Sequence, residues 1–94
     1  MTEFRLLYSE TAANQIKKCH PELKAIIRRR LDKLKAMPRC GKKLERELAG
    51  YRSLRAKRYR IIYKLKESDG IIEIHHIGHR RDIYELIADN LTDS

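Results

Sequence analysis

The spacing of apolar residues changes once along this chain, and the change restricts what the chain can fold into. Between residues 23 and 37 apolar side chains recur every three or four positions, which is typical of one buried helix face. From residue 51 to residue 77 they recur mainly at every second position, which is typical of strands. Helical periodicity followed by strand periodicity predicts an α+β fold.

Local signals place the remaining elements. Residues 3–9 alternate as a first strand, and Ser9 offers an N-cap hydroxyl to a short helix that Pro21 interrupts. Pro21 suits the first position of the long helix, which should end at Met37 because Pro38 disfavours helical geometry before it. The remaining predicted elements are a helical turn at 42–48, strands at 51–56, 58–66 and 71–77, a tight turn at 67–70, a strand end at Gly78 and a closing helix at 80–90.

These elements predict the order β-α-α-β-β-β-α in a single domain spanning residues 1–94. The helices are expected to pack on one face of a mainly antiparallel four-stranded sheet, with the first strand at an edge. A chain of 94 residues has room for one domain with a modest core.

Charge is the property that most restricts the partners of this chain. It has 22 Lys and Arg against 13 Asp and Glu, a formal net charge of +9, which favours a polyanionic partner such as nucleic acid or an acidic protein. No run approaches the roughly 20 apolar residues of a membrane span, and the N-terminus lacks the layout of a signal peptide. We therefore expect a soluble cytoplasmic domain that binds no membrane, with Cys19 and Cys40 as free thiols.

Most of the excess positive charge lies between residues 39 and 60. This stretch holds two acidic residues against nine basic ones, which are Arg39, Lys42, Lys43, Arg46, Arg52, Arg55, Lys57, Arg58 and Arg60. A second basic group, His79-Arg80-Arg81, follows the last predicted strand. The basic residues of the long helix, by contrast, are interpreted as a solvated outer face.

Side-chain alternation predicts where these cations point. On the strand at 58–66 alternate residues share the core face, namely Tyr59, Ile61, Tyr63 and Leu65. Arg58 and Arg60 should therefore project from the opposite face, with Ile62 and Lys64. On the preceding strand Arg52 shares the parity of the inward-pointing Leu54, so its placement depends on where that strand starts. Several guanidinium groups should thus converge on one sheet surface, where their planar donors match phosphate.

Histidines and tyrosines are weaker candidates for functional-site residues than the arginines and lysines. His75 and His76 should point to opposite faces of their strand, which excludes them as adjacent partners, and no grouping of His, Cys, Asp and Glu has metal-site spacing. His79 stands at the second basic group, and histidine is the side chain that changes charge near neutral pH. Tyr84, and with it Tyr51, competes for a role in stacking a nucleobase, while the other tyrosines are expected in the core.

Three segments carry a family resemblance: Leu48-Ala-Gly-Tyr-Arg52, Arg58-Tyr-Arg-Ile-Ile-Tyr63 and Ile77-Gly-His-Arg-Arg-Asp-Ile-Tyr84. In this order and spacing they resemble the RelE/ParE superfamily of toxins from type II toxin–antitoxin modules. The likeness spans nearly the whole chain, including its element order. The last segment looks more like the RelE branch than the gyrase-poisoning ParE branch.

The resemblance implies a specific reaction. RelE-type toxins are ribosome-dependent endoribonucleases that cut mRNA in the A site, by attack of a ribose 2′-hydroxyl on the adjacent phosphate. No metal or other cofactor is implied. By resemblance, Arg60 would stabilise the phosphorane-like transition state, Arg80 would assist the leaving group, and Tyr84 would stack on the cleaved nucleotide.

The sequence leaves more than one possibility for the group that removes the 2′-hydroxyl proton. By resemblance Arg52, with Arg55 or Lys57, would lie on the strand that grips the RNA backbone and assists proton removal. The best-known members carry lysines there, whereas an arginine, with a pKa above about 12, keeps its proton. Other members use a glutamate in the preceding loop, where this chain has no acid before Glu45. His79 is the candidate auxiliary proton carrier, and the alternative is that no single side chain acts as the base.

The predicted RNA contacts are the other cations of the two basic stretches, Lys42, Lys43, Arg55, Lys57, Arg58 and Arg81. The predicted partners are mRNA on the ribosome, with contacts to 16S ribosomal RNA, and an acidic cognate antitoxin. The free toxin is expected to be a monomer and its antitoxin complex a higher-order assembly. Two alternatives remain, a ParE-type DNA gyrase inhibitor without nuclease activity and a degenerate toxin that only binds its antitoxin.

Overall fold

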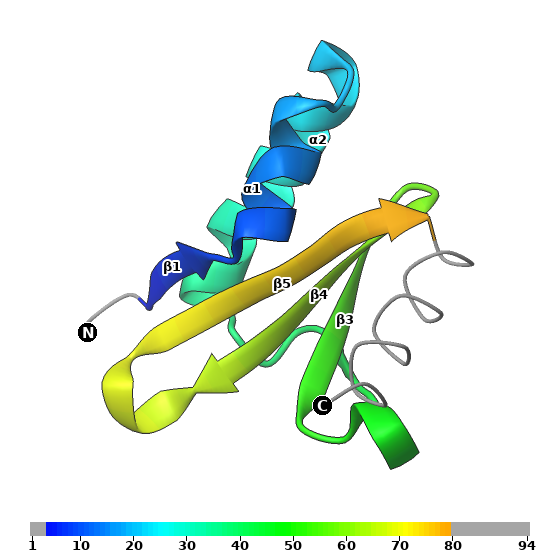
Figure 1. The fold of residues 1–94 in the computed structure, drawn as a ribbon. Coiled ribbons are helices and arrows are strands. Elements are labelled where there is room, and N and C mark those ends of the chain that lie inside the picture. Colours follow the sequence, from blue (N-terminus) through cyan, green and yellow to red (C-terminus); the bar gives the residue numbers. More distant parts are fainter. Residues whose placement is uncertain (1–3, 80–94) are drawn as a thin grey trace.

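A computed structural model describes residues 4–79 of the chain. In chain order the elements are β1 (Arg5–Tyr8), α1 (Glu10–Lys17), α2 (Pro21–Ala36), β2 (Lys42–Lys43), the 3₁₀ turn η1 (Arg46–Leu48), β3 (Tyr51–Ala56), β4 (Tyr59–Lys66), the 3₁₀ turn η2 (Glu67–Asp69) and β5 (Ile71–His79) (Figure 1). The predicted α+β class is confirmed, while the closing helix expected at 80–90 lies outside the described residues. Neither described helix is both long enough and apolar enough to cross a membrane.

The sheet has five strands rather than the predicted four, in the order β1-β5-β4-β3-β2. β1 lies at an edge, as predicted, and pairs in parallel with β5, whereas the other pairings are antiparallel. The additional strand is β2, which pairs with Arg52 and Ser53 of β3. Two residues are too few to show an alternating pattern, and β2 and η1 stand where the sequence predicts a helical turn at 42–48.

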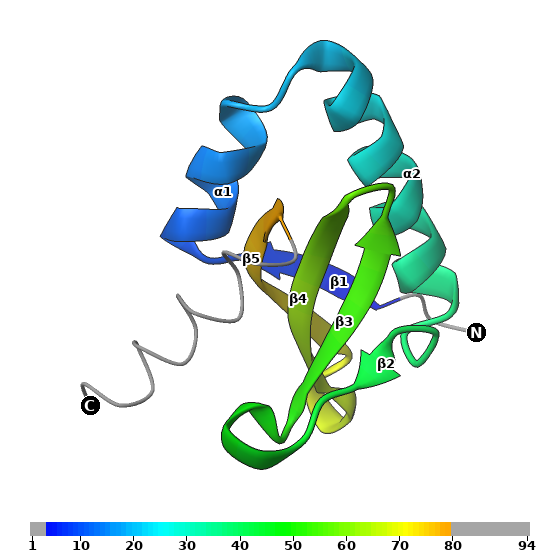
Figure 2. The same ribbon diagram turned by 90° about the vertical axis from the view of Figure 1, so that its right-hand side faces the viewer.

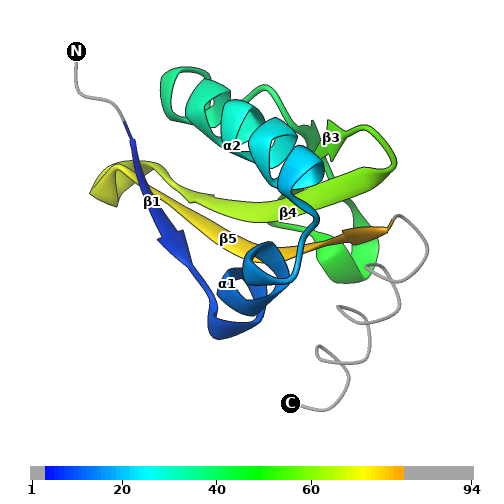
Figure 3. The same cartoon turned by 90° about the horizontal axis from the view of Figure 1, so that it is seen from above.

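Both helices cover the same face of the sheet, which we call the helix face (Figure 3). The helices stand apart over its two halves, with α1 beside β5 and α2 beside β3 (Figure 2). The buried core lies between the helices and this face and consists of Ala12, Ile27, Leu31, Leu34, Ala56, Ile61, Tyr63, Ile72, Ile74 and Ile77. We call the side of the sheet that α1 and α2 leave uncovered the open face.

The helix ends follow the predicted signals. The Ser9 hydroxyl accepts a hydrogen bond from the Ala12 N–H at 3.0 Å and so caps α1. Pro21 is the first residue of α2, where its missing N–H leaves no helical bond unmade. α2 ends at Ala36, and Met37 is its exposed cap rather than a core residue.

A β-bulge in β5 overturns the predicted orientation of two histidines. Ile74 pairs with Tyr63 but His76 pairs with Ile62, so His75 is an extra residue in the ladder. Because the extra residue reverses the alternation, His76 lies on the open face with Ile62, and the ring of His75 contacts Tyr51 there. The two histidines therefore lie on the same face, not on opposite faces.

The N-cap of α1 and a side chain within α1 satisfy backbone groups around this bulge. The Ser9 hydroxyl donates to the His75 carbonyl at 2.8 Å, and the Ile77 N–H donates to the Gln15 side-chain oxygen at 2.7 Å. β1 pairs with β5 only as far as Ile74, so α1 supplies the partners beyond that point. With this support β5 continues through Gly78 to His79, whereas the sequence predicts that Gly78 ends the strand.

Candidate functional site

A basic pocket of about 480 Å³ lies at the outer edge of the sheet, around the end of β3. It is lined by Arg30, Cys40, Lys42, Ser53, Leu54, Arg55, Lys57 and Arg60, which include five cations and no acidic residue. β2 pairs only with Arg52 and Ser53, so it leaves the rest of this edge of β3 uncovered. A pocket with this lining attracts anions and repels cations.

Two arginines of the basic pocket occupy directly opposed positions. Arg55 of β3 and Arg60 of β4 are register partners on the open face, and Arg60 has Gly78 as its partner on the other side. Like charges directly opposite one another destabilise an antiparallel pair. The pair therefore lowers the stability of the free protein, as expected for a site that binds an anion.

The β3–β4 turn holds Arg55 in place. The Arg55 Nε donates to the Lys57 carbonyl at 3.1 Å, and Lys57 adopts the uncommon positive φ of 56°. The turn thus keeps one guanidinium edge occupied and leaves the remaining donors of Arg55 toward the pocket. Its geometry also shortens β4, which begins at Tyr59 rather than at residue 58.

The open face next to the pocket carries a row of smaller groups. Ser53 and His76 are the register partners of Ile62 on its two sides, so the three lie in one row across the sheet. Both polar residues are buried, and neither the Ser53 hydroxyl oxygen nor the His76 Nδ1 has a hydrogen-bond partner among the described residues. Burial, together with the neighbouring His75, holds the pKa of His76 below its ordinary value.

A charged cluster borders this row further along β5. Glu73 lies 3.4 Å from the Lys66 ammonium and 3.3 Å from the His75 Nε2, and the Lys64 ammonium lies over the Tyr51 ring. Burial raises the pKa of Glu73, but the hydrogen bond from His75 and the charge of Lys66 outweigh it and hold the pKa below its ordinary value. This end of the open face therefore carries a carboxylate that partly offsets its lysines, whereas no acidic residue is among the described residues that line the basic pocket.

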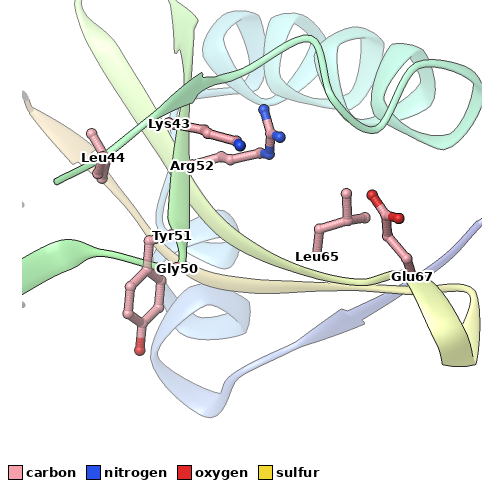
Figure 4. Close-up of a pocket in the computed structure, with 7 residues that line it drawn as sticks. All are labelled: Lys43, Leu44, Gly50, Tyr51, Arg52, Leu65 and Glu67. Carbon is pink, nitrogen blue, oxygen red and sulfur yellow. The ribbon is translucent and has the colours of Figure 1, made fainter.

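Arg52 and Lys43, two of the predicted site residues, lie on the other side of the sheet from Arg60. Arg52 pairs with the core residue Tyr63 and with Lys43, so both project toward the helix face. They line a separate pocket of about 310 Å³, in which Tyr51 and Arg52 leave β3 in opposite directions (Figure 4). The Arg52 Nη1 donates to the carbonyls of Arg39 and Gly41, at 3.2 and 3.0 Å. This contact fixes the loop before β2, so Arg52 does not join the predicted convergence of guanidinium groups.

His79 and Arg58 are also placed away from Arg60. His79 pairs with Tyr59, whose side chain packs against the core, and the two rings lie 4.5 Å apart between centroids. Arg58 belongs to the β3–β4 turn and lines a different pocket beside α2, because the strand alternation does not extend to it. His79 therefore does not contact the Arg55–Arg60 pair, and its predicted role beside Arg80 stays a prediction. Arg80, Arg81 and Tyr84 lie outside the described residues.

The structure adds Arg30, Ser53 and Cys40 to the site. Arg30 belongs to the face of α2 that the sequence suggests is merely solvated, and only the packing of α2 against β3 brings it to the basic pocket. Cys40 is an exposed free thiol, as is expected from the cysteine spacing. Within residues 4–79 no three His, Cys, Asp or Glu side chains are grouped as metal ligands.

Fold and site together define a small basic α+β domain with a cationic pocket at its sheet edge. Residues 6–84 match the family described as the ParE toxin of the type II toxin–antitoxin system, parDE. The chain therefore belongs to the RelE/ParE superfamily of type II toxins, and the resemblance seen in the sequence is confirmed.

Individual relatives agree with this assignment. The toxin RelG of Mycobacterium tuberculosis is 34% identical over 83 residues, which are 86% of this chain and 95% of RelG. A chain in the crystal structure of the toxin–antitoxin complex RelBE2 from the same organism has a TM-score of 0.74 and 30% identity, covering 83% of this chain and 99% of that chain. An archaeal RelE–RelB complex from Pyrococcus horikoshii shares the fold, with a TM-score of 0.72 at 22% identity over 85% of this chain and 97% of that chain. The protein is thus a type II toxin of the RelE family.

Proposed function

We propose that this toxin is a ribosome-dependent endoribonuclease that cuts mRNA in the A site in the cytoplasm and thereby stops translation. The observation that carries the proposal is the opposed Arg55–Arg60 pair in a pocket whose described lining has five cations and no acid. Guanidinium groups in that arrangement match the oxygens of a phosphodiester. A pocket of this composition has no evident purpose in a protein that binds only cations or apolar groups.

The proposed reaction is attack of a ribose 2′-hydroxyl on the adjacent phosphorus. The bond from the 2′-oxygen to phosphorus forms, the bond from phosphorus to the 5′-oxygen breaks, and the products carry a 2′,3′-cyclic phosphate and a 5′-hydroxyl. Arg60 would neutralise the charge that develops on the phosphorane oxygens, with Arg55 beside it. Arg80 and Tyr84 keep the leaving-group and stacking roles implied by the family resemblance.

The remaining cations would hold the RNA. Lys42, Lys57 and Arg30 line the basic pocket and would contact the backbone on either side of the reacting phosphate. Arg58, Lys43 and Arg52 lie on other surfaces and would contact ribosomal RNA, with Arg81 assigned to RNA by resemblance. Such phosphate contacts should make binding weaken steeply with salt.

We also propose an acidic antitoxin as the physiological partner. The related M. tuberculosis and P. horikoshii toxins were crystallised as complexes with antitoxins. A net charge of +9 on 94 residues favours an acidic polypeptide that covers the basic pocket. The free toxin would be a monomer and the complex a higher-order assembly.

Expression in bacteria with mapping of mRNA 5′ ends tests the proposal. Wild-type protein should arrest growth and produce new 5′ ends inside open reading frames. The Arg60→Ala/Arg80→Ala variant should produce none, whereas Arg5→Ala/Arg28→Ala removes the same charge from exposed positions of β1 and α2 and should cut normally. Growth arrest without new 5′ ends contradicts the proposal.

The family description favours one second candidate. The matching family is described as ParE of parDE, and the resemblance links the ParE branch to inhibition of DNA gyrase. Under that function, expression would induce the DNA-damage response while mRNA stays intact. Normal growth together with a stable antitoxin complex would instead indicate a degenerate toxin.

A further inference from the structure

The bulge in β5 places an unassigned histidine beside the arginine pair. His76 is the partner of Ile62, and Arg60 is two residues before Ile62 on the same face of β4, so Arg60 and His76 are diagonal neighbours. Such neighbours lie roughly 7–8 Å apart along the sheet, within reach of long side chains. The position opposite Arg60 is Gly78, which places no side chain between the guanidinium and the imidazole.

The environment of His76 is unusual for a structural histidine. It is only 9% exposed, and its Nδ1 makes no hydrogen bond with any described residue. An unpaired buried polar atom destabilises a fold, so each one calls for an explanation. The other unpaired buried side-chain atom of the described residues, the Ser53 hydroxyl oxygen, lies in the same row on the far side of Ile62. Both orphaned atoms thus border the Arg55–Arg60 row, where an incoming ligand would supply partners.

The imidazole ring of His76 is in the neutral form that can accept a proton. Burial and the adjacent His75 both disfavour the imidazolium, so the ring is neutral at neutral pH and its pKa lies below the ordinary value. Its charged or titratable neighbours on the open face are Tyr51, Arg55, Arg60, Lys64, Glu73 and His75. Glu73 is hydrogen-bonded to His75 and paired with Lys66, so its charge is already balanced.

We propose that His76 is the catalytic base, the group that takes the proton of the 2′-hydroxyl while Arg60 holds the phosphate; this rests on the endoribonuclease function proposed above. A ring nitrogen of His76 receives the proton as the 2′-oxygen bonds to phosphorus. The 5′-oxygen leaves and takes a proton from solvent or a nearby acid, and the imidazolium returns its proton to water. The assignment fills a role that no arginine of this chain can perform, because arginine keeps its proton.

A single-turnover assay with bacterial ribosomes, carrying an mRNA with an open A site, tests the proposal. His76→Gln should cut at least ~100-fold more slowly than wild type, since a positioned base contributes 10²–10⁴-fold. His75→Gln, which removes the adjacent histidine of the same face, should cut within a few-fold of wild type. The wild-type rate should fall as the pH drops through the pKa of His76, which lies below the ordinary 6.5, and His76→Gln should lose this dependence.

A structural role for His76 predicts different results. His76→Ala opens space at the ring position. If the ring supplies proton transfer, added imidazole should raise the cleavage rate of this variant at least ~10-fold. Urea unfolding of each variant shows whether the fold is kept; a folded His76→Ala that imidazole does not rescue overturns the proposal, as does a wild-type rate in His76→Gln. If wild type cuts and Arg60→Ala does not, the endoribonuclease function stands even when His76 fails. A wild-type protein that cuts no mRNA overturns both.

Discussion

Arg55 and Arg60 face one another across β3 and β4, two cations at directly opposed positions with Gly78 on the far side of Arg60. Within residues 4–79, no acidic residue lines the pocket that contains them. In the free protein no described acidic residue compensates the repulsion between these two cations. The two cations become favourable when an anion binds between them. Removing one of them should therefore raise the stability of the free protein and weaken the binding of RNA.

A change of charge at Arg55 should affect stability and RNA binding in opposite directions. Arg55→Glu turns a like-charge pair into an opposite-charge pair and should raise the free energy of unfolding by about 0.2–1 kcal/mol in low salt. The same variant should bind RNA more weakly. Urea unfolding and an RNA-binding titration measure the two effects. Arg5→Glu makes the same change of charge opposite the uncharged Ile71 and serves as the control; an equal gain in stability there would mean that net charge, not the pair, is responsible.

Tyr63 supports the loop that leads into the basic pocket. Its hydroxyl donates to the Pro38 carbonyl at 2.8 Å and accepts from the Gly41 N–H at 3.0 Å. Tyr63→Phe leaves both backbone groups without this partner, so the free energy of unfolding should fall by about 1–3 kcal/mol. Tyr8→Phe, at a site that is 44% exposed, should change it by less than about 0.5 kcal/mol. Equal effects in the two variants would contradict the tethering role of Tyr63.

Arg52 should behave as a positioning residue. Its Nη1 bonds to the carbonyls of Arg39 and Gly41 on the far side of the sheet from Arg60. Arg52→Ala should therefore lower the free energy of unfolding by about 1–2 kcal/mol and slow mRNA cleavage by less than ~10-fold. Arg39→Ala, which breaks only the exposed pair with Glu67, should lower stability by less than about 1 kcal/mol. A loss of cleavage in Arg52→Ala as large as that in Arg60→Ala would show direct participation in the reaction.

His76 should make the stability of the fold pH-dependent. Its pKa in the folded protein lies below the ordinary 6.5, so below about pH 6.5 the unfolded chain binds more protons than the folded one. The free energy of unfolding should therefore fall as the pH drops from 6.5 through the folded pKa, and level off above 6.5. His76→Gln should lose this share of the dependence, while His79→Gln, at an exposed position of the same strand, should keep it. Urea unfolding between pH 5 and 8 measures the difference; identical profiles for wild type and His76→Gln would contradict the buried neutral histidine.

The parts of the fold that follow from the sequence are those with a long, regular pattern. The apolar stripe of α2 identifies Ile27, Leu31 and Leu34 as core residues. The alternation along β4 places Arg60 on the side opposite the core residues Ile61 and Tyr63. Each rests on many residues of one period, which a single local irregularity does not disturb.

The features that the sequence does not predict each depend on tertiary structure. The bulge at His75 reverses the alternation without any Gly or Pro to mark it, and the contacts of Ser9 and Gln15 from α1 support it. Arg30 joins the basic pocket only because α2 packs beside β3, and β2 is too short to have a period. Arg52 keeps the parity of Leu54, yet its destination depends on the loop carbonyls that its side chain meets.

The chemistry of the cut ends tests the proposed endoribonuclease function directly. Purified toxin, bacterial ribosomes and a defined mRNA are incubated, and the products are labelled by polynucleotide kinase without prior phosphatase treatment. We expect fragments with a 5′-hydroxyl, which accept label directly, and a 2′,3′-cyclic phosphate on the upstream piece, with Arg60→Ala roughly 100- to 1,000-fold slower. Uncut mRNA, or fragments with a 5′-phosphate, would contradict the proposed function.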